Sequence, residues 1–226
     1  MATREPFVVD EWYHCFNRGV DKRIVFEGPG DYERFLTHIY ISNGSKNIRV
    51  STLPSTDLNS ILLDESIDRG EPIVEIGAYS LMPNHFHILI KETQEGGIAT
   101  FMQKTFTGYT MYFNNKNERT GALFAGTFKS RHVSDDRYLK QLVPYILLNP
   151  IELFEASWKE GVGDINALEK KLMRYEYSSL PDFAGHARPL GKLVGNSLRS
   201  YYDLVPSLEE MLNDARSYYE QYSPQV

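Results

Sequence analysis

The chain has 226 residues, a formal charge of −6 and a single cysteine, Cys15. Its 42% hydrophobic and 24% charged residues are ordinary for a globular protein, and the length predicts one large domain or one domain with an appendage. One cysteine excludes an internal disulfide and a cysteine-rich structural zinc site. The N-terminus lacks an apolar signal core and no run approaches ~18 apolar residues, so we expect a soluble, cytoplasmic protein with no membrane partner.

The acidic balance argues against a nucleic-acid partner, but the charge is unevenly distributed along the chain. Residues 99–140 carry 7 basic and 3 acidic groups, a local charge of +4. Local charge decides whether a phosphate backbone can dock. Aromatic side chains lie among these cations, which suits stacked single-stranded bases. The helical spacing of Phe106, Tyr109 and Phe113 suits a buried stripe equally well, and we favour the core for these three.

The first third of the chain predicts a strand, a helix and an irregular segment. Residues 12–18 are typical of a strand that Gly19 closes. Asp31 is suited to cap a helix over 32–41, whose apolar positions recur on one face. Residues 42–72 hold turn-forming and short apolar stretches without a clear period, so we expect a loop or small insertion there.

The remaining pattern predicts an antiparallel sheet covered by helices. Pro83-Asn84 is typical of a tight turn between two strands, and Ser134 is suited to cap a helix. We expect irregular polar segments after residue 150. In chain order we predict strands over 73–81 and 85–91, a helix over 98–116, a strand over 126–133, and helices over 135–148 and 207–222. This order predicts an α+β fold in which helices pack on one face of the sheet.

Two histidines on the second strand of the hairpin are candidate metal ligands. Side chains alternate along a strand, so His85 and His87 share one face while Phe86 points to the other. Two imidazoles on one face can grip one divalent metal ion. The same pattern also fits two surface histidines on a half-exposed strand.

A tyrosine and an asparagine on the helix over 135–148 are the second candidate pair. Tyr145 and Asn149 are four positions apart and therefore share a helix face. A tyrosine near a metal ion can attack phosphorus, and a neutral amide oxygen suits Mg²⁺ or Mn²⁺ better than a soft metal. Alternatively, Tyr145 packs in the core and Asn149 caps the helix before Pro150.

Five segments resemble the single-tyrosine transposases with a His-hydrophobe-His (HUH) motif, and among them the REP-associated tyrosine transposases. They occur in the family's order across about 13–184, so their combination is more specific than any one motif. The segments are MPNHFHILI (82–90), YHCFNRGVDKRIVF (13–26), DYERFL (31–36), GALFAGTFKSRHVSDDRYLKQLVPYILLNP (121–150) and YEYSSL (175–180).

The resemblance implies a ferredoxin-like domain that cleaves and rejoins single-stranded DNA, often beside a hairpin such as a REP element. His85, His87 and Asn149 match the family's metal-site positions, and Tyr145 matches its nucleophile. The family's divalent metal, Mg²⁺ or Mn²⁺, polarises the phosphate, and a 5′-phosphotyrosine link forms. Because rejoining reverses this step, no ATP is needed. The sequence does not show which group accepts the phenol proton.

Basic side chains near these positions are candidate DNA contacts. Lys129 and Arg131 alternate with Phe128 and Ser130 on the predicted basic strand, so they share a face and can hold phosphates. Arg18 ends the first strand and is assigned to DNA contact as well. A solvated edge face explains Lys129 and Arg131 equally simply.

Other tyrosines compete for the role of nucleophile. Tyr109 and Tyr112 have no metal-type side chain four residues further on, so we assign them to packing or DNA stacking. Tyr138 points to the core, which leaves Tyr145 as the predicted nucleophile. We expect His132 to be a partly buried histidine with a satisfied partner rather than a metal ligand.

The sequence departs from the family pattern at two places. Pro144 lies inside the predicted helix, where it removes one backbone hydrogen bond and costs ~3 kcal/mol if the helix stays regular. The segment 42–72 is longer than expected. We therefore predict a catalytic domain over 1–184 with an insertion at about 42–72, and a C-terminal extension over 185–226.

Three functions remain open. The leading hypothesis is a metal-dependent DNA transposase or endonuclease. The alternatives are a domesticated relative that binds hairpin DNA without cleaving it, and an RNA-binding module with the same sheet. A homodimer is possible, because relatives place the tyrosine helix against either their own or the partner's metal site.

Overall fold

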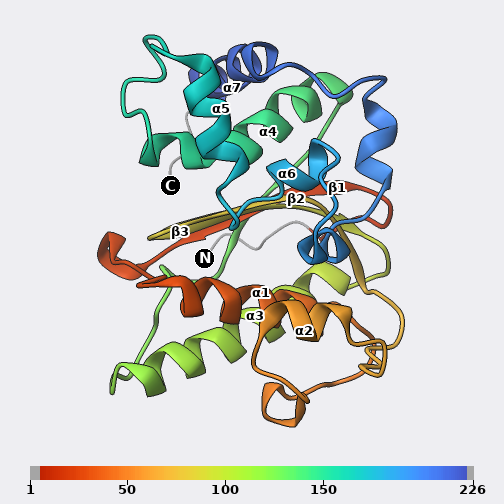
Figure 1. Cartoon of the computed structure of the whole chain (residues 1–226). Helices are drawn as coiled ribbons and strands as arrows, with labels where there is room; N and C mark the ends of the chain where they lie inside the picture. Colours follow the sequence, from red (N-terminus) through yellow and green to blue (C-terminus); the bar gives the residue numbers. More distant parts are fainter. Residues whose placement is uncertain (1–5, 223–226) are drawn as a thin grey trace.

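An antiparallel sheet forms the centre of the structure, a computed structural model that describes residues 6–222 (Figure 1). Its strands are β1 (Trp12–Arg18), β2 (Val74–Met82), β3 (His85–Glu92) and β4 (Lys129–His132). Their spatial order is β2-β3-β1-β4, and each neighbouring pair is antiparallel. The predicted strands are confirmed, and β3 lies between two neighbours.

Helices cover both faces of this sheet. Figure 1 shows α1 and α3 on one face and α4 and α7 on the other. The chain order β-α-β-β-α-β is that of a ferredoxin-like sheet, so the predicted α+β class is confirmed. The helices are α1 (Pro29–Ser42), α2 (Leu58–Leu63), α3 (Gly97–Lys116), α4 (Asp136–Leu148), α5 (Ile165–Met173), α6 (Leu180–Phe183) and α7 (Leu208–Tyr222). Short 3₁₀ turns are η1 (Val20–Lys22), η2 (Val50–Thr52), η3 (Asn149–Leu153), η4 (Pro189–Leu193) and η5 (Ser197–Tyr201).

Alternation along β3 divides the side chains between two cores. Phe86, Ile88 and Ile90 are buried in the core beneath α1 and α3. Leu89 points the other way, into the core beneath α4 and α7. Each such burial stabilises the fold by about 1.5–3 kcal/mol. The prediction that the helices pack on one face only is wrong, because the helix that carries Tyr145 covers the face opposite to α1 and α3.

The N-caps of α1 and α4 are not the predicted residues, and Asp31 lies inside the first turn of α1. α1 begins at Pro29, whose fixed φ suits the first turn, and Asp31 accepts the Glu27 amide hydrogen at 2.8 Å. α4 is capped by Asp135 rather than Ser134, because the Asp135 carboxylate accepts the Tyr138 amide hydrogen at 2.8 Å. α4 continues through Pro144 to Leu148.

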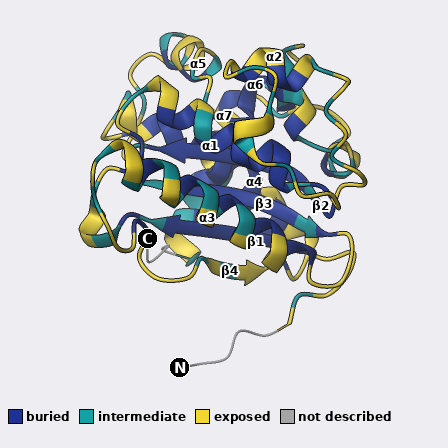
Figure 2. Ribbon diagram, turned by 90° about the horizontal axis from the view of Figure 1, so that it is seen from below, coloured by how far each residue is buried: buried dark blue, intermediate teal, exposed yellow. Residues whose placement is uncertain are grey.

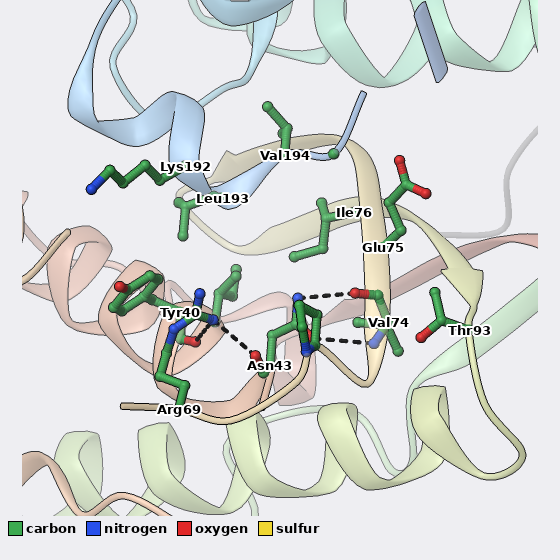
Figure 3. A pocket seen from close by; sticks show the side chains of 13 residues that line it. Tyr40, Asn43, Arg69, Val74, Glu75, Ile76, Thr93, Lys192, Leu193 and Val194 are labelled. Carbon is green, nitrogen blue, oxygen red and sulfur yellow. Dashed lines mark hydrogen bonds between the residues drawn. The ribbon is translucent and has the colours of Figure 1, made fainter. Parts of the chain in front are cut away.

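The segment 42–72 contains a helix and is hydrogen-bonded to the neighbouring elements. It contains the unpredicted helix α2, three of whose side chains are buried: Leu58, Ile61 and Leu62. Arg69 donates to the carbonyl oxygens of Tyr40 (2.9 Å) and Asn43 (2.8 Å), and its guanidinium lies 3.9 Å from the Tyr40 ring centroid. Asn43 in turn hydrogen-bonds the backbone of Val74 (Figure 3). These bonds tie the segment to the end of α1 and the start of β2.

The C-terminal third is more regular than its polar sequence indicates. It contains α5, which the pattern did not predict, and the confirmed final helix α7. Residues 177–179 hydrogen-bond along β2, through Leu81 N–H to Tyr177 and Ser179 N–H to Tyr79. The division into 1–184 and 185–226 stays a prediction, and its ends, 1–5 and 223–226, lie outside the described residues.

Hydropathy gives one further result about the helices. Within residues 6–222, no helix combines the length and the apolar character needed to cross a lipid bilayer.

Candidate active site

The two predicted histidines lie side by side on the face of β3 that α4 covers. His87 pairs with Phe16 of β1 and Ser80 of β2, so it occupies the middle of the sheet and has no exposed surface. His85 lies nearer the end of β3 and is partly exposed. The centroids of the two imidazole rings are 5.2 Å apart. Phe86 between them is buried on the opposite face, as the strand alternation predicts.

α4 brings the predicted tyrosine and asparagine onto these histidines. The Tyr145 hydroxyl lies 3.4 Å from His87 Nε2, and Asn149 Oδ1 lies 3.0 Å from His85 Nε2. The four residues predicted from two separate motifs therefore form one cluster, within one chain. Both structural alternatives also hold: Tyr145 is 3% exposed, and Asn149 ends α4.

A third histidine, His14 of β1, belongs to the same cluster and was missed from the sequence. Its Nε2 lies 2.9 Å from His87 Nδ1, and the two rings stack with centroids 5.0 Å apart. His14 alternates with Tyr13 and Cys15, so the strand pattern does place it on one face of β1, the face of Trp12. What the sequence hides is that β1 lies beside β3 with that face towards α4.

Burial keeps these imidazoles neutral. Desolvation lowers the pKa of His85 to about 4 and that of His14 to about 3. The pKa of His87 falls well below its ordinary value for the same reason, with His14 and His85 adding to the effect. A neutral imidazole has one free lone pair, which is the form that binds a metal ion.

The contacts of His85 fit a cation between its ring and Asn149. His85 Nδ1 faces Asn84 Oδ1 at 2.7 Å and its Nε2 faces Asn149 Oδ1 at 3.0 Å. A neutral ring has one N–H, so it donates to only one of these oxygens. At the other, two lone pairs approach each other unless the amide rotates or both atoms bind one cation that lies beside them.

The donors of this cluster are neutral. Among the described residues, no group of three histidine, cysteine, aspartate or glutamate side chains is arranged to hold a metal ion. Two imidazoles and an amide oxygen suit Mg²⁺ or Mn²⁺ when phosphate oxygens complete the coordination. The residues therefore fit a metal ion that is held together with a phosphate substrate.

α7 closes the cluster from the outside. The Tyr218 ring stacks on Tyr145 with centroids 4.5 Å apart and an interplanar angle of 28°. Its hydroxyl lies 3.2 Å from that of Tyr138 and 3.5 Å from His14 Nδ1. Burial raises the pKa of the Tyr145 and Tyr218 phenols. In this arrangement a nucleic-acid strand cannot reach the Tyr145 hydroxyl, because Tyr145 is buried beneath Tyr218.

The three predicted DNA-contact residues lie on the strands around the cluster. Lys129 and Arg131 are exposed on the edge strand β4, and they share a face because they pair with Phe16 and His14. Figure 2 shows β4 exposed along the sheet edge. Arg18 ends β1 opposite His85.

The competing side chains have structural partners. Tyr109 is fully buried and donates to the Val25 carbonyl, and Tyr112 donates to Asp31 at 2.9 Å. His132 lies 3.2 Å from Glu11, on the face of β4 that points away from the cluster. Tyr109 therefore packs in the core, one of the two roles predicted for it. His132 has a partner, as predicted, but it is exposed rather than partly buried.

Similarity to known proteins is found at the level of structure. The sequence matches no family model and no curated protein. Among solved structures, a REP-associated tyrosine transposase bound to a REP hairpin is similar at 13% identity, with a TM-score of 0.48. The similarity covers 88% of this chain and 96% of that one. At this identity the match assigns no residue roles.

Proposed function

We propose that this protein is a metal-dependent DNA strand transferase that uses Tyr145 as its nucleophile. The observation that carries the proposal is the contact of Tyr145 with His87, and of Asn149 with His85, across 58 and 64 positions of the chain. The motif resemblance adds the substrate: single-stranded DNA beside a hairpin, such as a REP element. Arg18, Lys129 and Arg131 are proposed to hold its phosphates.

The proposed reaction exchanges one phosphoester bond for another. The Tyr145 oxygen attacks a scissile phosphorus, a bond from phosphorus to the phenolic oxygen forms, and the bond to the 3′ oxygen breaks. The phenol loses its proton and the leaving 3′ oxygen gains one. The products are a 5′-phosphotyrosine link and a free 3′ hydroxyl, and attack by another 3′ hydroxyl reverses the step.

Several residues of this chain have defined tasks in that step. His85, His87 and Asn149 would hold Mg²⁺ or Mn²⁺, which when bound draws charge from the phosphate oxygens. His14 fixes the orientation of the His87 ring through their 2.9 Å contact. The 3.4 Å contact of His87 Nε2 with the Tyr145 hydroxyl keeps the phenol beside the residues that would hold the metal ion.

The closed site favours a second candidate function, hairpin DNA binding without cleavage. Tyr145 is 3% exposed and lies under Tyr218, so in this conformation DNA cannot reach the Tyr145 hydroxyl. The basic strand β4 stays exposed and remains available for phosphate contacts. In this alternative α7 never leaves the cluster.

A covalent-adduct assay separates the two functions. The full chain is mixed with a labelled single-stranded hairpin DNA and Mg²⁺ or Mn²⁺, and denaturing electrophoresis detects protein that remains bound to label. We expect an adduct that chelator and Tyr145→Phe both abolish, whereas the control Tyr201→Phe, at a partly exposed tyrosine of η5, leaves it unchanged. Tight binding without an adduct under any metal contradicts cleavage and supports the binding function. Preference for an RNA hairpin with no metal effect contradicts both.

A further inference from the structure

A second pocket lies on the other side of the sheet from the candidate active site. It has a volume of about 540 Å³ and is formed by α1, α3 and the segment that follows α1. This size is typical of sites that hold small ligands or part of a larger one. α1 and α3 each present polar side chains to it, and residues 46–51 form the third wall.

The lining of this pocket is basic. Arg34, Lys46, Arg49 and Lys104 line it, and the lining contains no aspartate or glutamate. Lys46 is paired with Asp68. None of the salt bridges among the described residues includes the other three cations. In a protein of net charge −6, three such cations around one hollow create a local positive field that attracts an anion.

Two buried nitrogen atoms of the lining lack a partner. His38 is 7% exposed, and its Nε2 accepts or donates no hydrogen bond within the described residues. The same holds for Arg34 Nε, whose guanidinium lies 4.8 Å from the Tyr112 ring centroid. Buried polar atoms are nearly always paired, so these two nitrogens beside the hollow have hydrogen-bonding capacity that no described residue uses.

The absence of a side chain at Gly108 allows the His38 ring to lie close to the backbone of α3. A Cβ atom at Gly108 would lie 2.4 Å from His38 Cε1 and 2.5 Å from its Nδ1. Burial lowers the pKa of His38 to about 4, so the ring is neutral and one of its nitrogens carries a proton. The imidazole therefore adds a hydrogen-bond donor to a wall of cations.

We infer that this pocket binds a phosphate group. Arginine presents a planar set of N–H donors that matches phosphate oxygens, and lysine adds a point charge. The phosphate has two possible sources, the backbone of a nucleic acid or a free phosphate compound. The inference rests on this pocket alone and holds whether or not Tyr145 cleaves DNA.

Inorganic phosphate is the probe that tests the pocket directly. The full chain is titrated in a phosphate-free buffer, and the ring C–H signals of His38 are followed by NMR. We expect a saturable shift, and at least fivefold weaker binding in Arg49→Gln/Lys104→Gln. The control Lys170→Gln/Lys171→Gln removes two exposed cations of α5 and keeps the wild-type affinity. Absence of a saturable shift in the wild type, or equal affinity in both double variants, overturns the inference.

A second titration identifies the source of the phosphate. Fluorescence anisotropy measures binding of a labelled single-stranded DNA oligonucleotide to the same variants. A parallel loss of DNA affinity in Arg49→Gln/Lys104→Gln, absent from the control, assigns the pocket to a nucleic-acid backbone. Unchanged DNA affinity with lost phosphate binding assigns it to a free phosphate compound.

Discussion

His14 sets the tautomer of His87 through the contact between His14 Nε2 and His87 Nδ1. The 2.9 Å separation of His14 Nε2 and His87 Nδ1 requires that one nitrogen donates and the other accepts. When His87 Nδ1 donates, its Nε2 lone pair is free for a metal ion. Hydrogen bonds of this kind fix the tautomer and orientation of ligating histidines. His14 is thus a positioning residue in the proposed site.

His14→Phe is expected to weaken metal binding without removing a proposed ligand. The phenyl ring keeps most of the packing but leaves His87 Nδ1 without its partner. We expect a loss of roughly 10–100-fold in Mn²⁺ affinity, which electron paramagnetic resonance of free Mn²⁺ measures. His132→Phe, on the neighbouring strand and exposed, is the matched control. Unchanged Mn²⁺ affinity in a folded His14→Phe protein contradicts the positioning role.

At the scale of elements, α7 is the cover of the site. Its buried face consists of Leu208, Met211, Leu212, Ala215 and Tyr218, and this face packs on α4. Tyr218 stacks directly on Tyr145, so the same contact that stabilises the helix pair also hides the proposed nucleophile. The proposed cleavage would therefore require a conformation in which Tyr218 of α7 no longer covers Tyr145.

Tyr218→Ala is expected to open the site and destabilise the fold at once. Truncating a fully buried aromatic ring typically costs about 3–5 kcal/mol, so the melting temperature falls. If displacement of α7 limits the reaction, adduct formation becomes several-fold faster at a temperature where the variant is folded. Glu209→Ala, at an exposed position of the same helix, serves as control for both measurements. A slower reaction in the folded Tyr218→Ala protein shows that α7 supports the site instead of covering it.

The sequence was most informative where periodicity and caps were strong. The strands of the hairpin around Pro83-Asn84 and the helices α3, α4 and α7 lie within a few residues of their predicted bounds. α2 and α5 were missed because they are short, with 6 and 9 residues, so each contains too few helical turns to stand out as a repeat. In α2, tertiary burial of Leu58 and Ile61 stabilises a helix that its own pattern does not indicate.

The site was partly predictable for a similar reason. Alternation puts His85 with His87, and helical spacing puts Tyr145 with Asn149, but neither rule brings the two pairs together. The motif resemblance supplied that step. His14 and Tyr218 escaped prediction because they reach the cluster through strand pairing and through the packing of α7, which are long-range facts.

At the scale of the whole molecule, much of the basic segment 99–140 is already committed within the protein. Lys116 forms salt bridges with Asp31 and Glu27, and Lys104 lines the second pocket. Lys129 and Arg131 of β4 are exposed on the side of the candidate active site. If the protein binds DNA as proposed, we therefore expect it to contact few phosphates, because its charge is −6 and few exposed cations lie on that face.

The salt dependence of DNA binding measures that number. Each neutralised phosphate of a single strand contributes about −0.7 to the slope of log K against log salt concentration, so contact with three to five phosphates predicts a slope of about −2 to −4. Lys129→Gln is expected to flatten the slope by about 0.7, the contribution of one phosphate, because it removes one cation beside the cluster. Lys171→Gln, an equally exposed lysine on α5, leaves the slope unchanged. A slope steeper than about −6, or equal effects of the two variants, means that DNA contacts the whole surface rather than the face that β4 borders.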